Sequence, residues 1–388
     1  MRTILPTLLL ACTVVLEACK GCREDPVSPI DDVPEDPHDI GSWLSMDVLN
    51  DQPAVAYYDK TSGALAFAVG TVGDDGVTWS EERIDGYEDP NTGLDSGDRG
   101  QYASLAISDS GTAWVSYYDA TNGNLFYAQR KGKDDWETGF ADSGGGATPH
   151  GGRWSSLQVD GDGNPVIAHY DVAKQQLRVV RWQDTGFGSG EVVDEGETWE
   201  APDTAEDVDD IPADVGKYAK LLIQDGVEYL AYYDGAQGQL KLATNTGAGW
   251  EIDVVDDGGD DNLDVGKWPS IMVDGGTVHV AYQDATNYDL LLATKSGDEW
   301  SVEVVDDGPY TGADAELYAN GSYPAIVYFE GEENDIRLAT FDGANWTLDT
   351  MAGSEAALGF HNETVVVGGT RYIGCYDYTN RTIWLTSL

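Results

Sequence analysis

Short runs of apolar residues, each bounded by glycine, asparagine or aspartate, fill most of the chain. The stretch 100–142 shows the pattern clearly, with apolar runs at residues 105–107, 114–118 and 125–128 and a fourth run that opens at Trp136. Runs of roughly 4–7 residues that are rich in β-branched and aromatic side chains indicate strands, since these side chains fit a pleated, half-buried surface. The stretch therefore predicts four antiparallel strands joined by short turns.

The same four-strand unit recurs seven times. Each copy opens at a glycine, in order Gly41, Gly100, Gly152, Gly216, Gly266, Gly312 and Gly359. The second strand of each copy ends at an acid, in order Asp59, Asp119, Asp171, Asp234, Asp284, Glu330 and Asp377. Gly41 to Leu388 spans 348 residues, about 50 per copy, and a four-stranded repeat of this length is typical of a propeller blade. We predict an all-β, seven-bladed β-propeller of four-stranded antiparallel blades over residues 38–388.

The seventh copy reaches Leu388 after only three predicted strands. Residues 27–32, Val-Ser-Pro-Ile-Asp-Asp, resemble residues 302–307, which form the predicted fourth strand of the fifth copy. We therefore expect residues 26–33 to supply the missing strand and close the ring, which pairs edges that would otherwise be exposed. A proline is acceptable there, because the outermost strand of a blade is an edge strand.

Residues 1–19 have the features of an export signal. Arg2 precedes an apolar run that extends from Ile4 to Leu16 and is too short to cross a bilayer. Residues 16–19, Leu-Glu-Ala-Cys, resemble the bacterial lipoprotein signal, which implies cleavage and lipidation at Cys19. An ordinary secretory peptide remains the alternative. We expect an exported protein, an outer-membrane or cell-surface lipoprotein, in which residues 20–37 form an acidic, proline-rich tether.

The net charge and the cysteines limit the kinds of partner and metal site that we expect. The formal net charge is −49, so the protein repels nucleic acid and anionic membrane surfaces, and we exclude both as partners apart from the lipid anchor. The hydrophobic fraction of 41% and the 12 tryptophans indicate a folded chain. The four cysteines, at positions 12, 19, 22 and 375, show no metal-ligand spacing, and a pairing of Cys22 with Cys375 stays open.

Two sets of residues recur on the face where the copies open. The first set is an aromatic residue two positions after the opening glycine, namely Trp43, Tyr102, Trp154, Tyr218 and Trp268. The sixth and seventh copies have Asp314 and His361 there. The second set is the acids that end the second strands, of which we single out Asp59, Asp119, Asp171, Asp234 and Asp284. These sets predict a ring of aromatic platforms and carboxylates for a sugar, but the aromatics could also wedge blades and the acids could bond turn amides.

Metal binding and catalysis have weaker support in the sequence. Asp160, Asp162 and Asn164 offer oxygen ligands at short spacing, as does the run 256–262, but neither is a complete calcium loop. We expect no cofactor, with calcium as the open alternative at Asp160. No Gly-x-Ser-x-Gly, phosphate-loop or dinucleotide motif is present.

The repeat over residues 41–388 resembles the propeller repeats of secreted bacterial lipoproteins and, more distantly, sialidase-like and fucose-lectin-like propellers. The turn at residues 109–114 is similar to part of the sialidase Asp-box, with Ile107 where that motif has serine. Arg153 beside Trp154 is similar to the basic residue and aromatic of a lectin site, which implies that Arg153 contacts ligand.

These observations predict a monomeric, non-catalytic extracellular binding module whose ligand is a carbohydrate or another cell-surface molecule, including a protein. The insertions 85–99 and 194–215 are expected on the same face as the aromatics, where insertions in repeat proteins often shape a binding surface. Two alternatives remain: a sialidase-like glycoside hydrolase and a purely structural surface protein.

Overall fold

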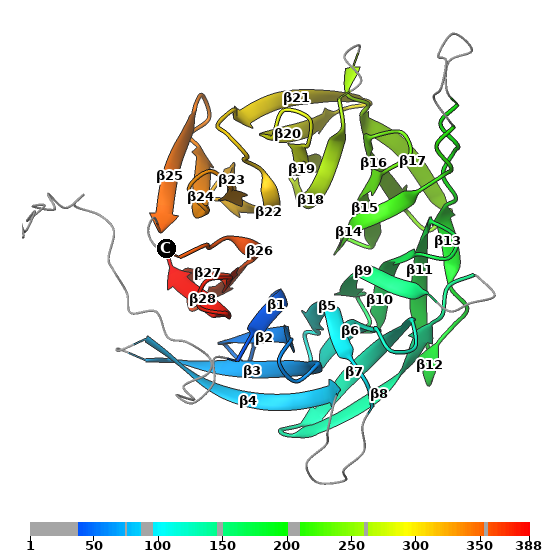
Figure 1. Ribbon diagram of the computed structural model, residues 1–388, viewed down its shortest axis with the longest axis vertical. Helices are drawn as coiled ribbons and strands as arrows, with labels where there is room; N and C mark the ends of the chain where they lie inside the picture. The colour runs from blue at the N-terminus through cyan, green and yellow to red at the C-terminus, as the bar shows by residue number, and fades with distance from the viewer. Residues whose placement is uncertain are drawn as a thin grey trace, which may run out of the picture.

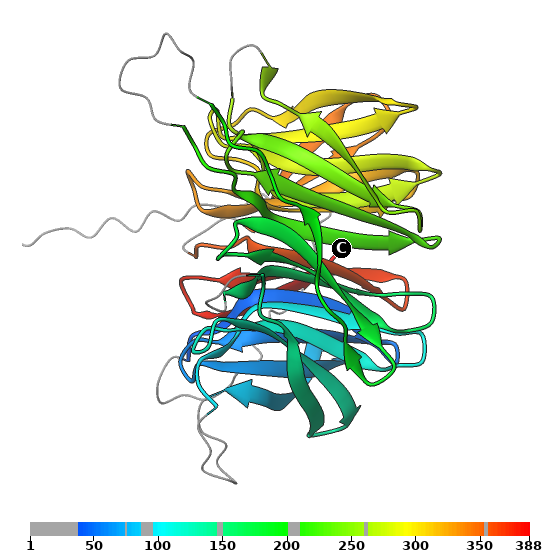
Figure 2. The ribbon, with the colours of Figure 1, turned by 90° about the vertical axis from the view of Figure 1, so that its right-hand side faces the viewer.

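The computed structural model describes residues 38–73, 76–86, 96–145, 150–200, 210–259, 263–352 and 356–388. Within these residues, seven antiparallel sheets surround a central axis, and the chain passes once around the ring (Figure 1). The strands run across the thickness of the ring (Figure 2). The predicted seven-bladed all-β propeller is therefore confirmed.

The first four blades follow the predicted copies. Blade 1 contains β1 (Ile40–Leu49), β2 (Gln52–Asp59), β3 (Ala64–Gly73) and β4 (Gly76–Gly86). Blade 2 contains β5 (Arg99–Ile107), β6 (Ala113–Asp119), β7 (Asn124–Gly132) and β8 (Asp135–Asp142). Blade 3 contains β9 (Gly151–Val159), β10 (Pro165–Asp171), β11 (Gln176–Gln183), β12 (Gly186–Phe187) and β13 (Glu191–Asp194). Blade 4 contains β14 (Val215–Gln224), β15 (Val227–Asp234), β16 (Gln239–Asn245) and β17 (Trp250–Asp256).

The last three blades complete the ring. Blade 5 contains β18 (Val265–Asp274), β19 (Thr277–Asp284), β20 (Asp289–Ser296) and β21 (Glu299–Asp306). Blade 6 contains β22 (Ala313–Asn320), β23 (Tyr323–Glu330), β24 (Asp335–Phe341) and β25 (Trp346–Ala352). Blade 7 contains β26 (Phe360–Val367), β27 (Thr370–Asp377) and β28 (Thr382–Ser387). The predicted signal, tether and closing strand, residues 1–37, lie outside the described residues.

One predicted strand is interrupted. The sequence predicts a single fourth strand in blade 3 that opens at Phe187, but the structure has two short strands, β12 and β13, which both pair with β11. Residues 188–190, Gly-Ser-Gly, separate the two. Glycines in a strand often mark such a break, because they add no side chain to hold the pleat.

The position of a strand within its blade explains its composition. The first strands line the axis and the fourth strands form the rim of the ring (Figure 1). Every residue of β6 and β10 is buried, since neighbouring blades cover both faces of a second strand. The rim strand β25 has four consecutive exposed residues. The continuous apolar runs that mark the copies in the sequence are therefore the second strands.

Tyrosines of the second strands join neighbouring blades. Four hydroxyls donate hydrogen bonds to an aspartate that precedes the first strand of the next blade: Tyr58 to Asp98 (2.7 Å), Tyr170 to Asp214 (2.6 Å), Tyr233 to Asp264 (2.6 Å) and Tyr376 to Asp39 (2.6 Å). The last of these joins blade 7 to blade 1, as does the bond from the Ile40 N–H to the Arg381 carbonyl (3.0 Å). The two ends of the described ring are thus bonded to each other.

Candidate functional site

Each first strand begins with the same backbone irregularity. The opening glycines have φ angles from 88° to 117°, and an added Cβ at Gly100 would lie 2.8 Å from Leu65 Cα of the preceding blade. Glycine is required because the strand packs directly on that backbone. The pairing of β1 with β2 shifts register after Ser42, and the other first strands shift at comparable points. The bulge lies at the end of each strand where the predicted aromatic stands.

The residue two positions after the glycine adopts a left-handed backbone in all seven blades. The φ angles lie between 47° and 55° at Trp43, Tyr102, Trp154, Tyr218, Trp268, Asp314 and His361. This conformation costs about 1–2 kcal/mol for a residue with a Cβ. Glycine or asparagine would occupy it with less strain, so the backbone does not explain why five blades carry tryptophan or tyrosine. The presence of these aromatic side chains therefore needs an explanation other than backbone conformation.

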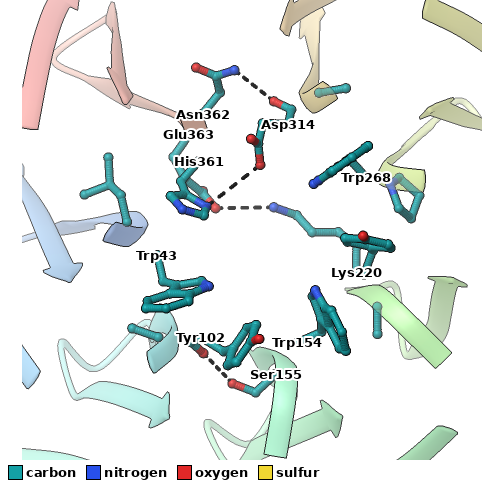
Figure 3. A pocket seen from close by; sticks show the side chains of 16 residues that line it. Trp43, Tyr102, Trp154, Ser155, Lys220, Trp268, Asp314, His361, Asn362 and Glu363 are labelled. Atoms are coloured by element: carbon teal, nitrogen blue, oxygen red, sulfur yellow. Dashed lines mark hydrogen bonds and ion pairs between the residues drawn. The ribbon is translucent and has the colours of Figure 1, made fainter. Parts of the chain in front are cut away.

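These side chains form a continuous aromatic arc around the axis (Figure 3). Neighbouring ring centroids are 5.0–5.4 Å apart along the sequence Trp43, Tyr102, Trp154, Tyr218 and Trp268, and the His361 ring lies 6.0 Å from Trp43. All six rings are half-buried. They are therefore not wedged inside the blades, and part of each ring faces solvent.

Asp314 occupies the break in the arc, between Trp268 and His361 (Figure 3). Its Oδ1 lies 3.8 Å from His361 Nδ1. Burial lowers the pKa of His361, although Asp314 acts in the opposite direction. The same burial raises the pKa of Asp314, although His361 opposes it. A neutral imidazole at neutral pH leaves the Asp314 carboxylate without a full countercharge.

A second layer lies two residues further along each first strand. In four blades it is a serine whose Oγ accepts a hydrogen bond from a backbone N–H of a neighbouring inner strand: Ser45 from Leu105 (3.0 Å), Ser104 from Leu157 (3.0 Å), Ser156 from Leu221 (2.9 Å) and Ser270 from Leu317 (2.9 Å). The other three blades carry Lys220, Glu316 and Glu363 at this position. In three blades, a charged residue thus replaces the serine that bonds neighbouring strands in the other four.

The three charged residues meet at the axis. Lys220 Nζ lies 3.2 Å from Glu316 Oε2 and 3.4 Å from Glu363 Oε1, although the residues come from blades 4, 6 and 7. Burial disfavours the charged form of Lys220, but the two carboxylates outweigh it and raise the pKa of the ammonium. Burial also raises the pKa of Glu363 to about 7, against the effect of Lys220. The cluster holds one ammonium between two carboxylates.

The two layers enclose a hollow on the axis. The arc, Asp314, Lys220 and Glu363 line a space of about 160 Å³ that is open to solvent. A second space of about 450 Å³ continues along the axis past Lys220, Glu316 and Glu363. The ionic cluster therefore forms the floor of the first space and separates it from the rest of the channel.

The predicted acids of the second strands lie elsewhere. Their carboxylates accept bonds from amides of their own turns, as Asp119 does from the Asn122 N–H (3.0 Å) and Asp284 from the Asn287 N–H (3.1 Å). The same pattern holds at Asp59, Asp171 and Asp234. None of these five carboxylates lines the hollow. The structure thus separates the aromatics from the acids and gives the acids a turn-closing contact.

Arg153 stands at the edge of the arc. Its guanidinium carbon lies 5.6 Å from the centroid of the Tyr118 ring. At the equivalent position, Lys217 and Lys267 pair with Asp214 and Asp264, but blade 3 has His150 where those aspartates stand. Among the described residues, Arg153 has no carboxylate partner.

The calcium candidates lie at the turn between β9 and β10, on the face opposite the arc. Asp160 Oδ1 accepts bonds from the backbone N–H groups of Asp162 (2.9 Å) and Asn164 (2.8 Å). In the part of the chain that the structure describes, no three His, Cys, Asp or Glu residues are placed to hold a metal ion. Part of the run 256–262 and parts of both insertions lie outside the described residues, as do Cys19 and Cys22. Cys375 is buried, with a free thiol.

Sequence reasoning found the aromatic arc but missed the floor beneath it. Lys220, Glu316 and Glu363 are not singled out by their own motif, because each stands alone in its copy. The available signal is the comparison between copies: four have serine four residues after the opening glycine and three have a charge.

Comparisons with known proteins find the same fold in other solved structures. No protein-family model matches the chain, and no curated protein matches it in sequence. Among solved structures, the polysaccharide lyase Uly1 is similar at 12% identity and a TM-score of 0.56, with 89% of each chain covered. The Hadza microbial sialidase Hz136 is similar at 11% identity and a TM-score of 0.50, with 88% of this chain and 73% of that one covered. A fucose-recognising lectin of Aleuria aurantia has 14% identity and a TM-score of 0.48, with 82% and 97% covered. Identities this low show a shared fold and nothing of the sites.

The described residues contain no helix long and apolar enough to cross a membrane.

Proposed function

We propose that the protein binds a carbohydrate in the aromatic hollow and releases it unchanged. The observation that carries this proposal is the half-buried arc of six aromatic rings around an open space. The apolar face of a sugar stacks on an aromatic ring, and a concave site with a few polar groups is the usual form of a ligand pocket. Each stacked ring contributes about 1 kcal/mol, so neighbouring rings together support a specific contact.

The size of the hollow favours one sugar residue or the end of a chain. A space of about 160 Å³ does not accommodate several residues side by side. Asp314 lines the hollow and provides a polar group for hydroxyls or charged substituents. Arg153, next to Trp154 in the chain, lies outside the lining and would meet only a part of the ligand that extends beyond the hollow. The ligand therefore enters the hollow end-on.

A glycan array with the wild type and two variants tests this proposal. Trp154→Ala and Trp268→Ala each remove a ring from the arc, and each should reduce glycan binding at least tenfold while the circular dichroism spectrum is kept. Tyr323→Ala is the matched control, because Tyr323 is an exposed aromatic at the turn on the opposite face. Absence of binding to any glycan by the wild type would favour a purely structural role.

Glycoside hydrolysis is the second candidate. Glu363 faces the hollow, and its pKa of about 7 is suitable for a general acid near neutral pH. Release of fluorophore from a panel of fluorogenic glycosides, lost in Glu363→Gln, would support catalysis. We expect no release above background from the wild type.

We also propose that the chain is exported and anchored through a lipid at Cys19, as an outer-membrane or cell-surface protein. The apolar run after Arg2 and the residues before Cys19 support this placement. Labelled palmitate should enter the wild type and not Cys19→Ala. Persistent label in Cys19→Ala would mean another site, with Cys12 as the next candidate.

A further inference from the structure

The two sides of the hollow differ in chemistry. Blades 1 to 5 supply the five tryptophan and tyrosine rings of the arc, whereas blades 6 and 7 supply Asp314, Glu316 and Glu363. The acids come from positions where the other blades carry an aromatic residue, a serine or, in blade 4, Lys220, so the repeat itself does not require them. Figure 3 shows Asp314 across the axis from Tyr102 and Trp154, with Trp268 as its neighbour in the arc.

The charges in and below the hollow do not cancel. Three carboxylates stand against the single ammonium of Lys220. Protonation of Glu363 would still leave two carboxylates for one ammonium. The site therefore has a negative potential, which is strengthened by partial burial and favours a positively charged ligand group.

Lys220 shows that the site accommodates an ammonium group. Its side chain passes beside the aromatic arc toward Glu363 (Figure 3). Its Nζ lies between Glu316 and Glu363. An ammonium among aromatic faces is attracted by the π electrons as well as by carboxylates. In the second layer, the protein's own Lys220 thus provides the cation for the two glutamates.

The layer that contains the aromatic arc has the Asp314 carboxylate but no lysine or arginine beside it among the described residues. In the described part of the chain, the ionic contact of Asp314 is His361 at 3.8 Å, and no lysine or arginine pairs with it. Asp314 also interrupts the arc, so that its carboxylate adjoins Trp268 and the open hollow (Figure 3). The backbone N–H of His361 also bonds this carboxylate, but it carries no charge. A partly buried carboxylate without a countercharge is costly, and a ligand cation at this point would reduce that cost.

We propose that the hollow selects a hexosamine residue with a free, protonated amine, with the sugar face on the tryptophans and the ammonium beside Asp314. This inference rests on the proposed carbohydrate binding and specifies the class of sugar. A neutral sugar would use the rings and leave Asp314 without a countercharge. An acidic sugar would face the carboxylates of Asp314 and Glu363, so both kinds of sugar should bind more weakly than the amino sugar.

Two trisaccharides of equal length separate the alternatives: the glucosamine trimer, which carries ammonium groups, and the N-acetylglucosamine trimer, which is neutral. Binding is measured by calorimetry in 150 mM salt, which screens the general negative charge of the protein. The glucosamine trimer should bind at least tenfold more tightly to the wild type. Asp314→Asn should lower its affinity at least fivefold and leave the affinity for the acetylated trimer within twofold.

Asp225→Asn is the matched control. Asp225 also has a left-handed backbone, with a φ of 53° against 48° at Asp314, but it is exposed at the turn between β14 and β15 on the opposite face. The same loss of one charge there should change neither affinity. An equal loss in Asp225→Asn would reveal non-specific charge attraction and would overturn the inference.

The outcomes also separate this inference from the proposed function. Equal or tighter binding of the acetylated trimer, lost in Trp154→Ala, would overturn the amino-sugar preference and keep carbohydrate binding. Tighter binding of a uronic-acid trimer would do the same. Failure of every sugar, on the array and in calorimetry, would overturn both.

Discussion

The strained backbone at Trp154 leads to an unusual order of stability among variants. Its φ of 47° is one that glycine adopts freely and alanine does not. Trp154→Gly and Trp154→Ala both delete the ring, so the loss of packing is similar in the two. We expect Trp154→Gly to be more stable than Trp154→Ala by about 1 kcal/mol, the reverse of the usual order within a strand.

Urea unfolding of the two Trp154 variants measures this difference. An alanine variant as stable as the glycine variant would show that the left-handed backbone relaxes without cost in solution. The same pair of substitutions at Trp136, which has no positive φ, should give the ordinary order, with alanine the more stable.

Glu363 gives the stability of the protein a defined pH dependence. Burial raises its pKa to about 7, from 4.5 in an exposed glutamate. Between these values the folded chain holds a proton that the unfolded chain has released, so this stabilising contribution is present below pH 4.5 and is lost as the pH rises through 7. Raising the pH from 5.5 to 8.5 should therefore cost the wild type about 1–2 kcal/mol more than Glu363→Gln.

Urea unfolding at the two pH values, with wild type and variant side by side, tests this expectation. Lys220 keeps Glu316 as a partner in Glu363→Gln, so the variant should fold. Glu299→Gln, an exposed control, should follow the wild type. Parallel pH profiles of wild type and Glu363→Gln would contradict a protonated Glu363 at low pH.

At the residue scale, the sequence predicts the arc but not the floor. The aromatic residues repeat at one position of the unit, so their meeting follows from the repeat alone. Lys220 and Glu363 are 143 residues apart, and their contact depends on how far each side chain reaches across the axis. No single copy contains that information.

At the element scale, the strands of the repeat were predictable because burial and turn chemistry agree. A second strand such as β6 is covered on both faces and reads as one apolar run, while its closing Asp119 fixes the turn. The division of the fourth strand of blade 3 into β12 and β13 does not follow from the repeat. Rim strands are exposed, so little in their sequence distinguishes one long strand from two short ones.

The bond between Tyr376 and Asp39 gives a test of the contact between blade 7 and blade 1. Tyr376→Phe leaves the half-buried Asp39 carboxylate without its closest donor, 2.6 Å away. We expect a loss of about 1 kcal/mol in the free energy of unfolding. Tyr378→Phe is the matched control, since its hydroxyl lies on an exposed side chain and should cost almost nothing. An equal change in the free energy of unfolding for the two variants would show that the bond between Tyr376 and Asp39 does not stabilise the ring.

At the scale of the whole molecule, the remaining prediction is the closing strand. Blade 7 has three described strands where blades 1, 2, 4, 5 and 6 have four. Deletion of residues 20–36 should lower the melting temperature by several degrees, because it removes the expected edge pairing of residues 26–33. Deletion of residues 20–25 alone should have no effect. Equal melting temperatures for all three chains would contradict closure by this segment.

The cluster at the axis also constrains how this protein can evolve. In an open array of repeats, each unit senses only its neighbours, so units can be duplicated or exchanged with local consequences. Here Lys220 of blade 4 contacts Glu316 of blade 6 and Glu363 of blade 7. A substitution at one of them changes the effect of substitutions at the other two, which is epistasis between units that are not adjacent. The blades share one fold, yet they cannot be reordered without separating these three charges.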